Sequence, residues 1–205
     1  MITLIDHDEG SQAGWGAISQ SLTAPAGATY LVVATASSPY GAVPTVTWNS
    51  VSVPVKHAYG GASGIFALAN PAIGTYTLAT TEVGDRGASW QALWLTGVNI
   101  ANPVRATISS VNPGASYQAT GFLPGDYFVA CGYAYLEESA IGPSGTGWTT
   151  RASYNSGFEQ SSCVGEAALP SASPYTLSLT NYSADDWHCG VVFGAAGGGN
   201  QVIWF

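Results

Sequence analysis

The chain has 205 residues and few charges: 4 basic and 12 acidic side chains give a formal net charge of −8 at pH 7. Nucleic-acid binding and anionic membrane surfaces both require clustered Lys and Arg, so this composition argues against either partner. Charged residues make up only 8% of the chain, against about 25% in ordinary soluble domains. Such a surface suits a protein that packs on partners or meets neutral sugars, and it also suits an ordinary Thr- and Ser-rich β protein.

The first residues show no basic segment followed by an apolar one, so we expect no secretory signal. No run approaches the roughly 18 apolar residues that a membrane-spanning helix needs. The three cysteines are Cys131, Cys163 and Cys189. An odd number without a signal argues against a disulfide framework. We expect buried thiols, with a Cys163–Cys189 bridge as the alternative.

The first half of the chain predicts short β-strands, because Val, Thr, Tyr and Trp alternate with polar residues between frequent Gly and Pro. No window has the apolar spacing of a helix. Asn49-Ser50 is a candidate tight turn. The acidic stretch after Ile5 is expected to end the first strand. The predicted strands are Met1–Ile5, Ser19–Thr23, Tyr30–Ala36, a hairpin over Thr45–Lys56, Ile65–Ala69, Thr75–Thr81 and Trp90–Thr96.

The second half repeats the first, after a connection at Asn99–Pro103. Residues 19–98 and 117–196 form the two copies, and matching residues lie 97 to 100 positions apart. Trp148 is matched to the hairpin tryptophan Trp48. Alternating apolar residues give each repeated strand one core-facing row. The recurring residues expected in the core are Trp48, Tyr76, Trp90, Trp148, Tyr175 and Trp187.

The predicted fold is an all-β, antiparallel, jelly-roll-like sandwich with two similar halves related by a pseudo-twofold axis. A single sheet cannot bury its apolar face alone, so two sets of strands must stack. The halves can intertwine as one sandwich or each close into a small one. The short connection favours a single compact body over residues 1–196.

A glycine-rich hinge and an apolar tail, residues 197–205, follow this body. Val202, Ile203, Trp204 and Phe205 would cost free energy if left in water, up to about 1.5–3 kcal/mol for each large side chain. The tail can return to its own domain as an edge strand, or it can add to a neighbouring subunit.

Two acidic clusters are candidates for cation binding, because hard cations prefer several oxygen ligands. Asp6-His7-Asp8-Glu9 lacks the spacing of an EF-hand loop and is better explained as a solvated turn. Asp185-Asp186 with His188 is similarly explained as a polar hairpin tip. Variable tips between repeated strands are the more natural places for partner contacts. With the tail, the candidate contacts are Asp85, Arg86, Tyr182, Asp185, Asp186, Val202, Ile203, Trp204 and Phe205.

No catalytic signature is present. Nucleophilic catalysis needs a nucleophile, a base and an orienting acid, and the sequence has no GxSxG, HExxH, CxxC or P-loop motif. Glu137, Glu138 and Glu159 have no context that favours a glycosidase pair. We expect no enzyme activity, no cofactor and no metal. Aromatic residues that could instead stack on sugars or face a partner are Trp15, Tyr40, Tyr59, Tyr133, Tyr135, Tyr154 and Tyr182.

Several segments together resemble structural proteins of tailed bacteriophages. They are PAGATYLVVA, GWTTRA, ALANPAIGTYTL, AALPSASPYTLSL and the closing segments LTGVN and VFGAA. The resemblance covers most of the chain. It implies a jelly-roll-like sandwich in a head decoration or cement protein, a spike or a fibre. It brings no catalytic residues.

From the resemblance we expect a virion component that is assembled in the host cytoplasm. Its partners would be its own copies, with a trimer as the first guess, and other virion proteins such as the major capsid protein. A tail-fibre or carbohydrate-binding module that recognises host-surface glycans is the alternative.

Overall fold

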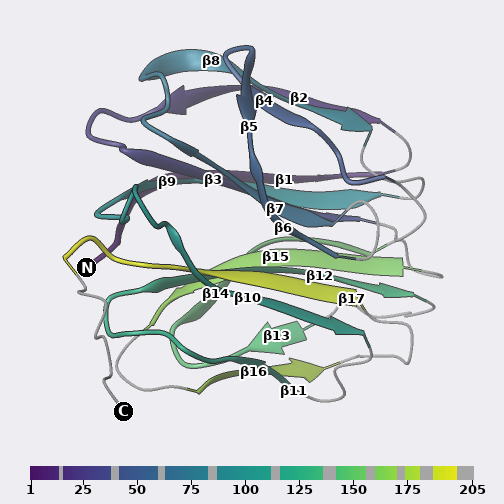
Figure 1. Cartoon of the computed structure of the whole chain (residues 1–205). Helices are drawn as coiled ribbons and strands as arrows, with labels where there is room; N and C mark the ends of the chain where they lie inside the picture. The colour runs from purple at the N-terminus through teal and green to yellow at the C-terminus, as the bar shows by residue number, and fades with distance from the viewer. Residues whose placement is uncertain are drawn as a thin grey trace.

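The computed structural model contains strands and no helix among the residues that it describes (Figure 1). These residues are 1–13, 16–37, 42–59, 63–82, 87–111, 116–135, 142–155, 160–169, 174–180 and 187–197. All strand pairs among them are antiparallel. The predicted all-β sandwich is therefore confirmed.

The first half forms a jelly roll of its own. Its inner sheet has the order β1-β9-β3-β7-β6 and its outer sheet the order β2-β8-β4-β5. The pairings are nested along the chain, because β1 pairs with β9, β2 with β8 and β3 with β7. Its strands are β1 (Thr3–Gln12), β2 (Ala17–Ala24), β3 (Tyr30–Ser37), β4 (Val46–Trp48), β5 (Val51–Val53), β6 (Val55–Ala58), β7 (Gly64–Ala69), β8 (Gly74–Glu82) and β9 (Ala88–Thr96).

The second half repeats this topology. Its inner sheet is β10-β17-β12-β15-β14 and its outer sheet is β11-β16-β13. The nested pairs are β10 with β17, β11 with β16 and β12 with β15. The strands are β10 (Val104–Val111), β11 (Ser116–Ala119), β12 (Tyr127–Tyr135), β13 (Gly142–Ser144), β14 (Trp148–Asn155), β15 (Gln160–Ala168), β16 (Tyr175–Thr180) and β17 (Trp187–Phe193).

Each sheet takes its strands from one half only. Of the two arrangements that the sequence left open, each half thus closes into its own sandwich, and the favoured intertwined sandwich is wrong. The physical reason is that the nested pairing lets each repeat complete both of its sheets before the chain leaves it. The two sandwiches nevertheless form one body, because their inner sheets pack face to face.

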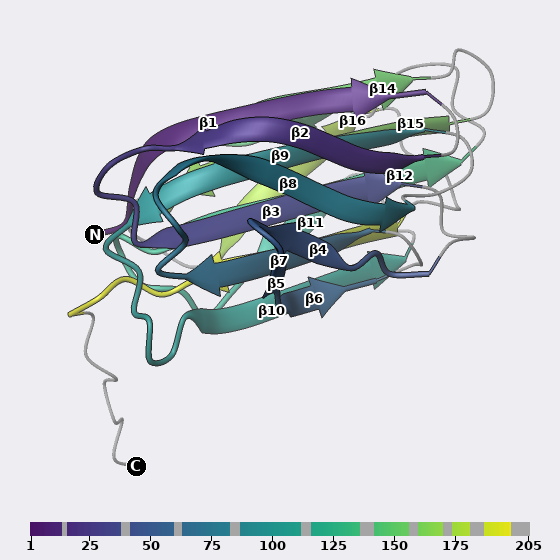
Figure 2. The same ribbon diagram turned by 90° about the horizontal axis from the view of Figure 1, so that it is seen from above.

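The molecule is therefore a stack of four β layers, with the two inner sheets in the middle (Figure 1). Three apolar clusters separate the layers. One lies inside the first jelly roll, one inside the second, and the third between the two inner sheets. Seen from above, the long strands of the stacked sheets run in a similar direction, as expected for aligned sheet packing (Figure 2).

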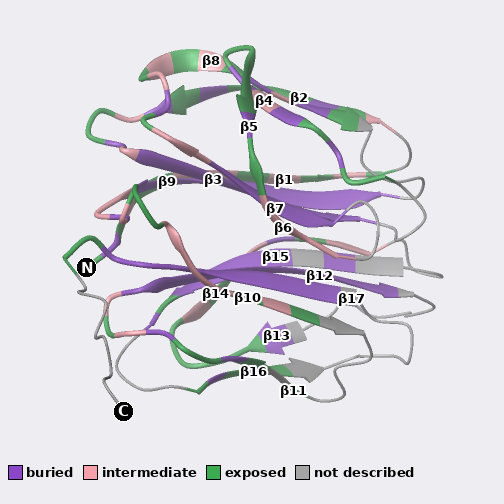
Figure 3. Cartoon of the chain, viewed as in Figure 1, coloured by how far each residue is buried: buried purple, intermediate pink, exposed green. Residues whose placement is uncertain are grey.

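Burial of the strands follows from these layers. Figure 3 shows the inner sheets as the main buried region. All eight residues of β3 are buried, and so are all of β9 except its last residue, because both faces of these strands are covered. In β2 only Ile18, Leu22 and Ala24 are buried, since its other face meets water.

Strand β1 runs further than predicted. The acidic stretch from Asp6 to Glu9 was expected to end the first strand as a solvated turn, but it lies inside β1 and pairs with β9. β1 is an edge strand of the inner sheet, where charged side chains are well tolerated. Successive residues of a strand point to opposite faces, so these four side chains do not converge on one cation.

The β4–β5 hairpin is confirmed, but its predicted counterpart is wrong. Asn49 and Ser50 have φ angles of 49° and 62°, the positive values that a two-residue hairpin turn needs. Trp148 instead begins β14, in the inner sheet of the second half. Both tryptophan rings still pack in the apolar cluster inside their own jelly roll. Trp48 lies edge-on to Tyr76, and Trp148 lies beside Phe128.

The two halves are related by reciprocal contacts where each jelly roll ends. The Ala196 amide donates to the Gly97 carbonyl at 2.7 Å, and the Asn99 amide donates to the Gly194 carbonyl at 2.8 Å. These are equivalent residues of the two repeats, and the equivalent pair Val98 and Ala195 forms an isolated bridge between them. Such reciprocity is the mark of a twofold interface.

Gly97 provides the first prediction. Its φ is +79°, and a Cβ there would lie 2.3 Å from the Met1 carbonyl oxygen. We expect Gly97→Ala to lower the free energy of unfolding by about 2–5 kcal/mol, combining left-handed strain with overpacking.

Gly121 is the matched control, since its φ is +72° and a Cβ there would meet nothing within 4 Å. Gly121→Ala should cost only the strain, about 1–2 kcal/mol. Denaturant unfolding of both variants measures the difference. Equal losses would show that the close approach of Met1 has no effect on stability.

Candidate functional site

All nine of the predicted partner contacts lie outside the described residues. This holds for Asp85, Arg86, Tyr182, Asp185, Asp186 and the tail residues Val202, Ile203, Trp204 and Phe205. They remain predictions. Among the core markers, Trp48, Trp90 and Tyr175 are buried, Tyr76 and Trp148 are partly buried, and the side chain of Trp187 is not described.

Ionisable side chains gather instead between the two inner sheets. The central pair is Arg151 of β14 and Glu166 of β15. Arg151 donates from Nε to Glu166 Oε1 at 2.9 Å and also from Nη2 to the same oxygen. The Glu166 side chain is only 4% exposed. Burial alone would lower the pKa of Arg151, but the Glu166 carboxylate outweighs burial and raises it.

The Arg151–Glu166 pair connects to the first half through His7 of β1. Arg151 Nη1 lies 3.1 Å from His7 Nε2, and because a guanidinium can only donate, this His7 nitrogen is the acceptor in any hydrogen bond between them. The same nitrogen is 3.3 Å from Glu9 Oε2. On the other side, burial and the Glu166 carboxylate raise the pKa of Tyr127 well above its usual range. A chain of charged and polar groups thus crosses from β1 to β12.

Three more polar links cross the same interface. Ser89 Oγ is 2.8 Å from Ser162 Oγ, and Gln91 Nε2 donates to the Gly165 carbonyl at 3.2 Å. At the opposite edge, His57 Nε2 of β6 lies 2.6 Å from Ser109 Oγ of β10. Buried polar groups need such partners, so these links allow polar side chains to lie between the apolar sheets.

A second ion pair lies at the end of the second jelly roll. Asp126 is 1% exposed and receives the guanidinium of Arg105 through Nε and Nη2. It also accepts hydrogen bonds from the Leu123 amide at 2.8 Å and the Ala195 amide at 2.9 Å. One buried carboxylate therefore holds β10, the turn before β12 and the segment after β17.

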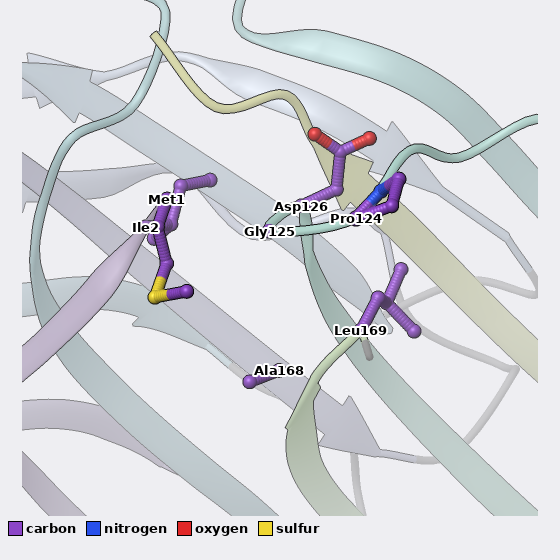
Figure 4. A pocket seen from close by; sticks show the side chains of 7 residues that line it. All are labelled: Met1, Ile2, Pro124, Gly125, Asp126, Ala168 and Leu169. Carbon is purple, nitrogen blue, oxygen red and sulfur yellow. The ribbon is translucent and has the colours of Figure 1, made fainter. Parts of the chain in front are cut away.

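The hollow beside Asp126, which we call the end pocket, has a volume of about 360 Å³. Figure 4 shows the Asp126 carboxylate pointing away from Ala168 and Leu169. The Gly125 carbonyl accepts from the Ile2 amide at 3.0 Å, so this polar group is occupied as well. The remaining walls are mostly apolar, so the pocket is better suited to apolar contacts than to catalysis. The lining residues are Met1, Ile2, Pro124, Gly125, Asp126, Ala168 and Leu169.

The aromatic residues considered for sugar stacking are mostly used internally where they are described. Tyr133 is buried, and Tyr59 packs against the cluster between the inner sheets. Tyr154 of the second half lies so close to Gly87 of the first that a Cβ on Gly87 would be 2.3 Å from its ring. Trp15, Tyr40 and the side chain of Tyr135 are outside the described residues.

The arrangement of the strands rules out the Cys163–Cys189 bridge that the sequence analysis gave as an alternative. Cys163 and Cys189 lie on β15 and β17, and β12 runs between these strands. A bridge between them would have to cross a strand, so this alternative is wrong. Cys131 and Cys189 are buried, as expected.

Sequence reasoning missed the two buried ion pairs. A signal for them was present, because Glu166 is the one charge in the run CVGEAAL and Asp126 directly precedes an apolar strand. Buried carboxylates require partners, and the chain has only four basic residues to supply them. Glu137, Glu138 and Glu159 fall outside the described residues.

The described residues contain no group of three or more His, Cys, Asp or Glu side chains placed to hold a metal ion. Within the same part of the chain, no helix has the length and apolar character to cross a membrane.

Comparison with known proteins assigns no family. No family model matches the chain, and no curated protein matches it. Among solved structures, oxalate decarboxylase from Bacillus subtilis at pH 4.6 matches with a TM-score of 0.22 and 9% identity, over 92% of this chain and 72% of that one. A deletion mutant of the same enzyme gives a TM-score of 0.21 over the same shares. Similarity at this level carries no structural or functional argument.

The Asp126 cluster yields a stability prediction. Asp126→Asn removes the charge that pairs with Arg105, so we expect the free energy of unfolding to fall by about 3–5 kcal/mol. Asp6→Asn is the control, because Asp6 is exposed on β1, and it should change stability by less than about 0.5 kcal/mol. Urea unfolding measures both, and similar small losses would contradict the structural role of Asp126.

His57 yields a pH prediction. Burial is the main effect on this side chain and lowers its pKa below 6.5. The unfolded chain then binds the proton more tightly than the folded one, so stability is lost as pH falls below about 6.5. We expect His57→Gln to flatten this part of the profile of unfolding free energy against pH. Parallel profiles for the two proteins between pH 7.5 and 5 would refute the prediction.

Proposed function

We propose that the protein is a non-enzymatic structural component of a bacteriophage virion, a capsid decoration or spike protein that acts through protein–protein contacts. The sequence resemblance to virion proteins of tailed phages suggests the particle. One structural observation carries the proposal. The described ionisable groups mostly pair with one another, within each jelly roll or across the contact between the two.

The chemistry of the described charged residues supports this reading. Two of the four basic side chains, Arg105 and Arg151, are held by buried carboxylates. His7 and His57 take part in hydrogen bonds between the two halves. Groups engaged in this way stabilise a four-layer body, and a durable body with few surface charges suits assembly into a particle.

The proposed partners are further copies of this chain, as a trimer, and other virion proteins such as the major capsid protein. The variable tips and the apolar tail are the proposed contacts. Since solvent-exposed Trp204 and Phe205 would be unfavourable, the tail is expected to be covered in the assembled particle. The protein would reach its virion location by assembly in the host cytoplasm.

Particle association is the direct test. An antibody against the recombinant protein should detect it in the density-gradient fraction that contains the major capsid protein of the producing phage. Full-length protein should also sediment as an oligomer, and a chain ending at Gly197 should sediment as a smaller species. The matched control replaces residues 198–205 by a Gly/Ser segment of equal length and should behave as the truncated chain does.

Detection only in the particle-free fractions would overturn the structural proposal. Binding to a glycan array by protein that does not associate with particles would favour the carbohydrate-binding alternative. Unchanged sedimentation after truncation would show that the tail is not one of the contacts between copies. Association with the particle would still be decided by the density gradient.

A further inference from the structure

Cys131 and Cys189 face each other inside the second inner sheet. They occupy directly opposite positions of the antiparallel strands β12 and β17, so their side chains lie on the same face of the sheet. The two Sγ atoms are 2.9 Å apart. This is shorter than the roughly 3.5–4.0 Å that is optimal between non-bonded carbon atoms, which are smaller than sulfur.

The backbone geometry permits a covalent bond between these sulfurs. Directly opposite residues of an antiparallel pair have Cα atoms about 4.5 or 5.5 Å apart, depending on their hydrogen bonding. Disulfides span Cα separations of about 4.4–6.8 Å. Either kind of pair therefore meets the requirement without a shift of the strands.

The third cysteine is excluded by register. Cys163 of β15 is opposite Gly132, the neighbour of Cys131 in β12, and successive positions of a strand alternate between faces. β12 also separates β15 from β17. Only one of the three possible pairs is thus placed for bonding.

We propose that Cys131 and Cys189 form a redox-active dithiol that a low-molecular-weight disulfide oxidises to a cross-strand disulfide. One thiol loses its proton and its thiolate attacks the small disulfide, which gives a mixed disulfide and releases one small thiolate. The second cysteine thiolate then attacks the mixed disulfide at the cysteine sulfur and releases the other small thiolate. Two protein thiols are oxidised, and one small disulfide is reduced to two thiols.

Access to this dithiol depends on the packing of the two halves. Cys131 is 2% and Cys189 0% exposed, and both belong to the cluster that joins the inner sheets. Oxidation therefore requires a transient opening of this interface, and it should be slow in the folded protein. Once formed, the bond closes a loop of about 60 residues, a length for which a disulfide is expected to stabilise the fold.

The test uses full-length protein purified in reductant, freed of it without oxygen and incubated with oxidised glutathione. After alkylation, intact mass should show the loss of two hydrogen atoms and one alkylated thiol. Peptide mapping without reduction should recover Cys131 joined to Cys189. The melting temperature should rise by about 5–15 °C relative to the reduced protein.

Cys163→Ser is the matched control and should form the same bridge, whereas Cys131→Ser and Cys189→Ser should not. Stable glutathione adducts at Cys131 or Cys189, a bridge that includes Cys163, or three alkylated thiols after prolonged incubation would overturn the proposal. The peptide map of the unsubstituted chain does not depend on the folding of any variant.

Discussion

The face-to-face packing of the two inner sheets is the constraint on which the rest of the structure depends. β3 and β9 of the first half present apolar residues on both faces, as do β12 and β17 of the second. Separation would expose Leu93, Val129 and Phe193, all fully buried, at about 25 cal/mol for each Å² of apolar surface. Neither jelly roll is therefore a self-sufficient unit, although each completes its own sheets.

The few charges of the chain are distributed according to the same constraint. Arg151 and Glu166 lie at the margin of the apolar interface, where each neutralises the other and where His7 extends the contact to β1. Asp126 binds three segments of the second half through Arg105, the Leu123 amide and the Ala195 amide. Buried ion pairs add less to stability than their geometry suggests, but the loss of one partner is costly. We therefore expect these pairs to hold the layers in one register as well as to stabilise the body.

The sequence predicted the repeat, the strand content and the antiparallel sandwich, because alternation and Gly/Pro interruptions are local signals. Tyr30 and Tyr127, which are 97 positions apart, begin the equivalent strands β3 and β12. Long-range facts were not accessible in this way. The acidic residues after Ile5 resembled a turn, although pairing with β9 keeps them extended, and Trp148 was matched by sequence to Trp48 although the second half uses it in another sheet. The facing thiols of Cys131 and Cys189 depend on register across 58 positions.

The reciprocal hydrogen bonds at Gly97 and Gly194 give the molecule the organisation of a homodimer whose subunits share one polypeptide. In a separate pair of such subunits, the residues after each closing strand would be two equivalent chain ends that cross at the axis. Here the residues after one closing strand form the connection that begins at Asn99, while those after the other continue as Ala196. In such a fused pair a mutation changes one copy at a time, so equivalent positions such as Asn99 and Ala196 differ in sequence while they keep the same reciprocal contact.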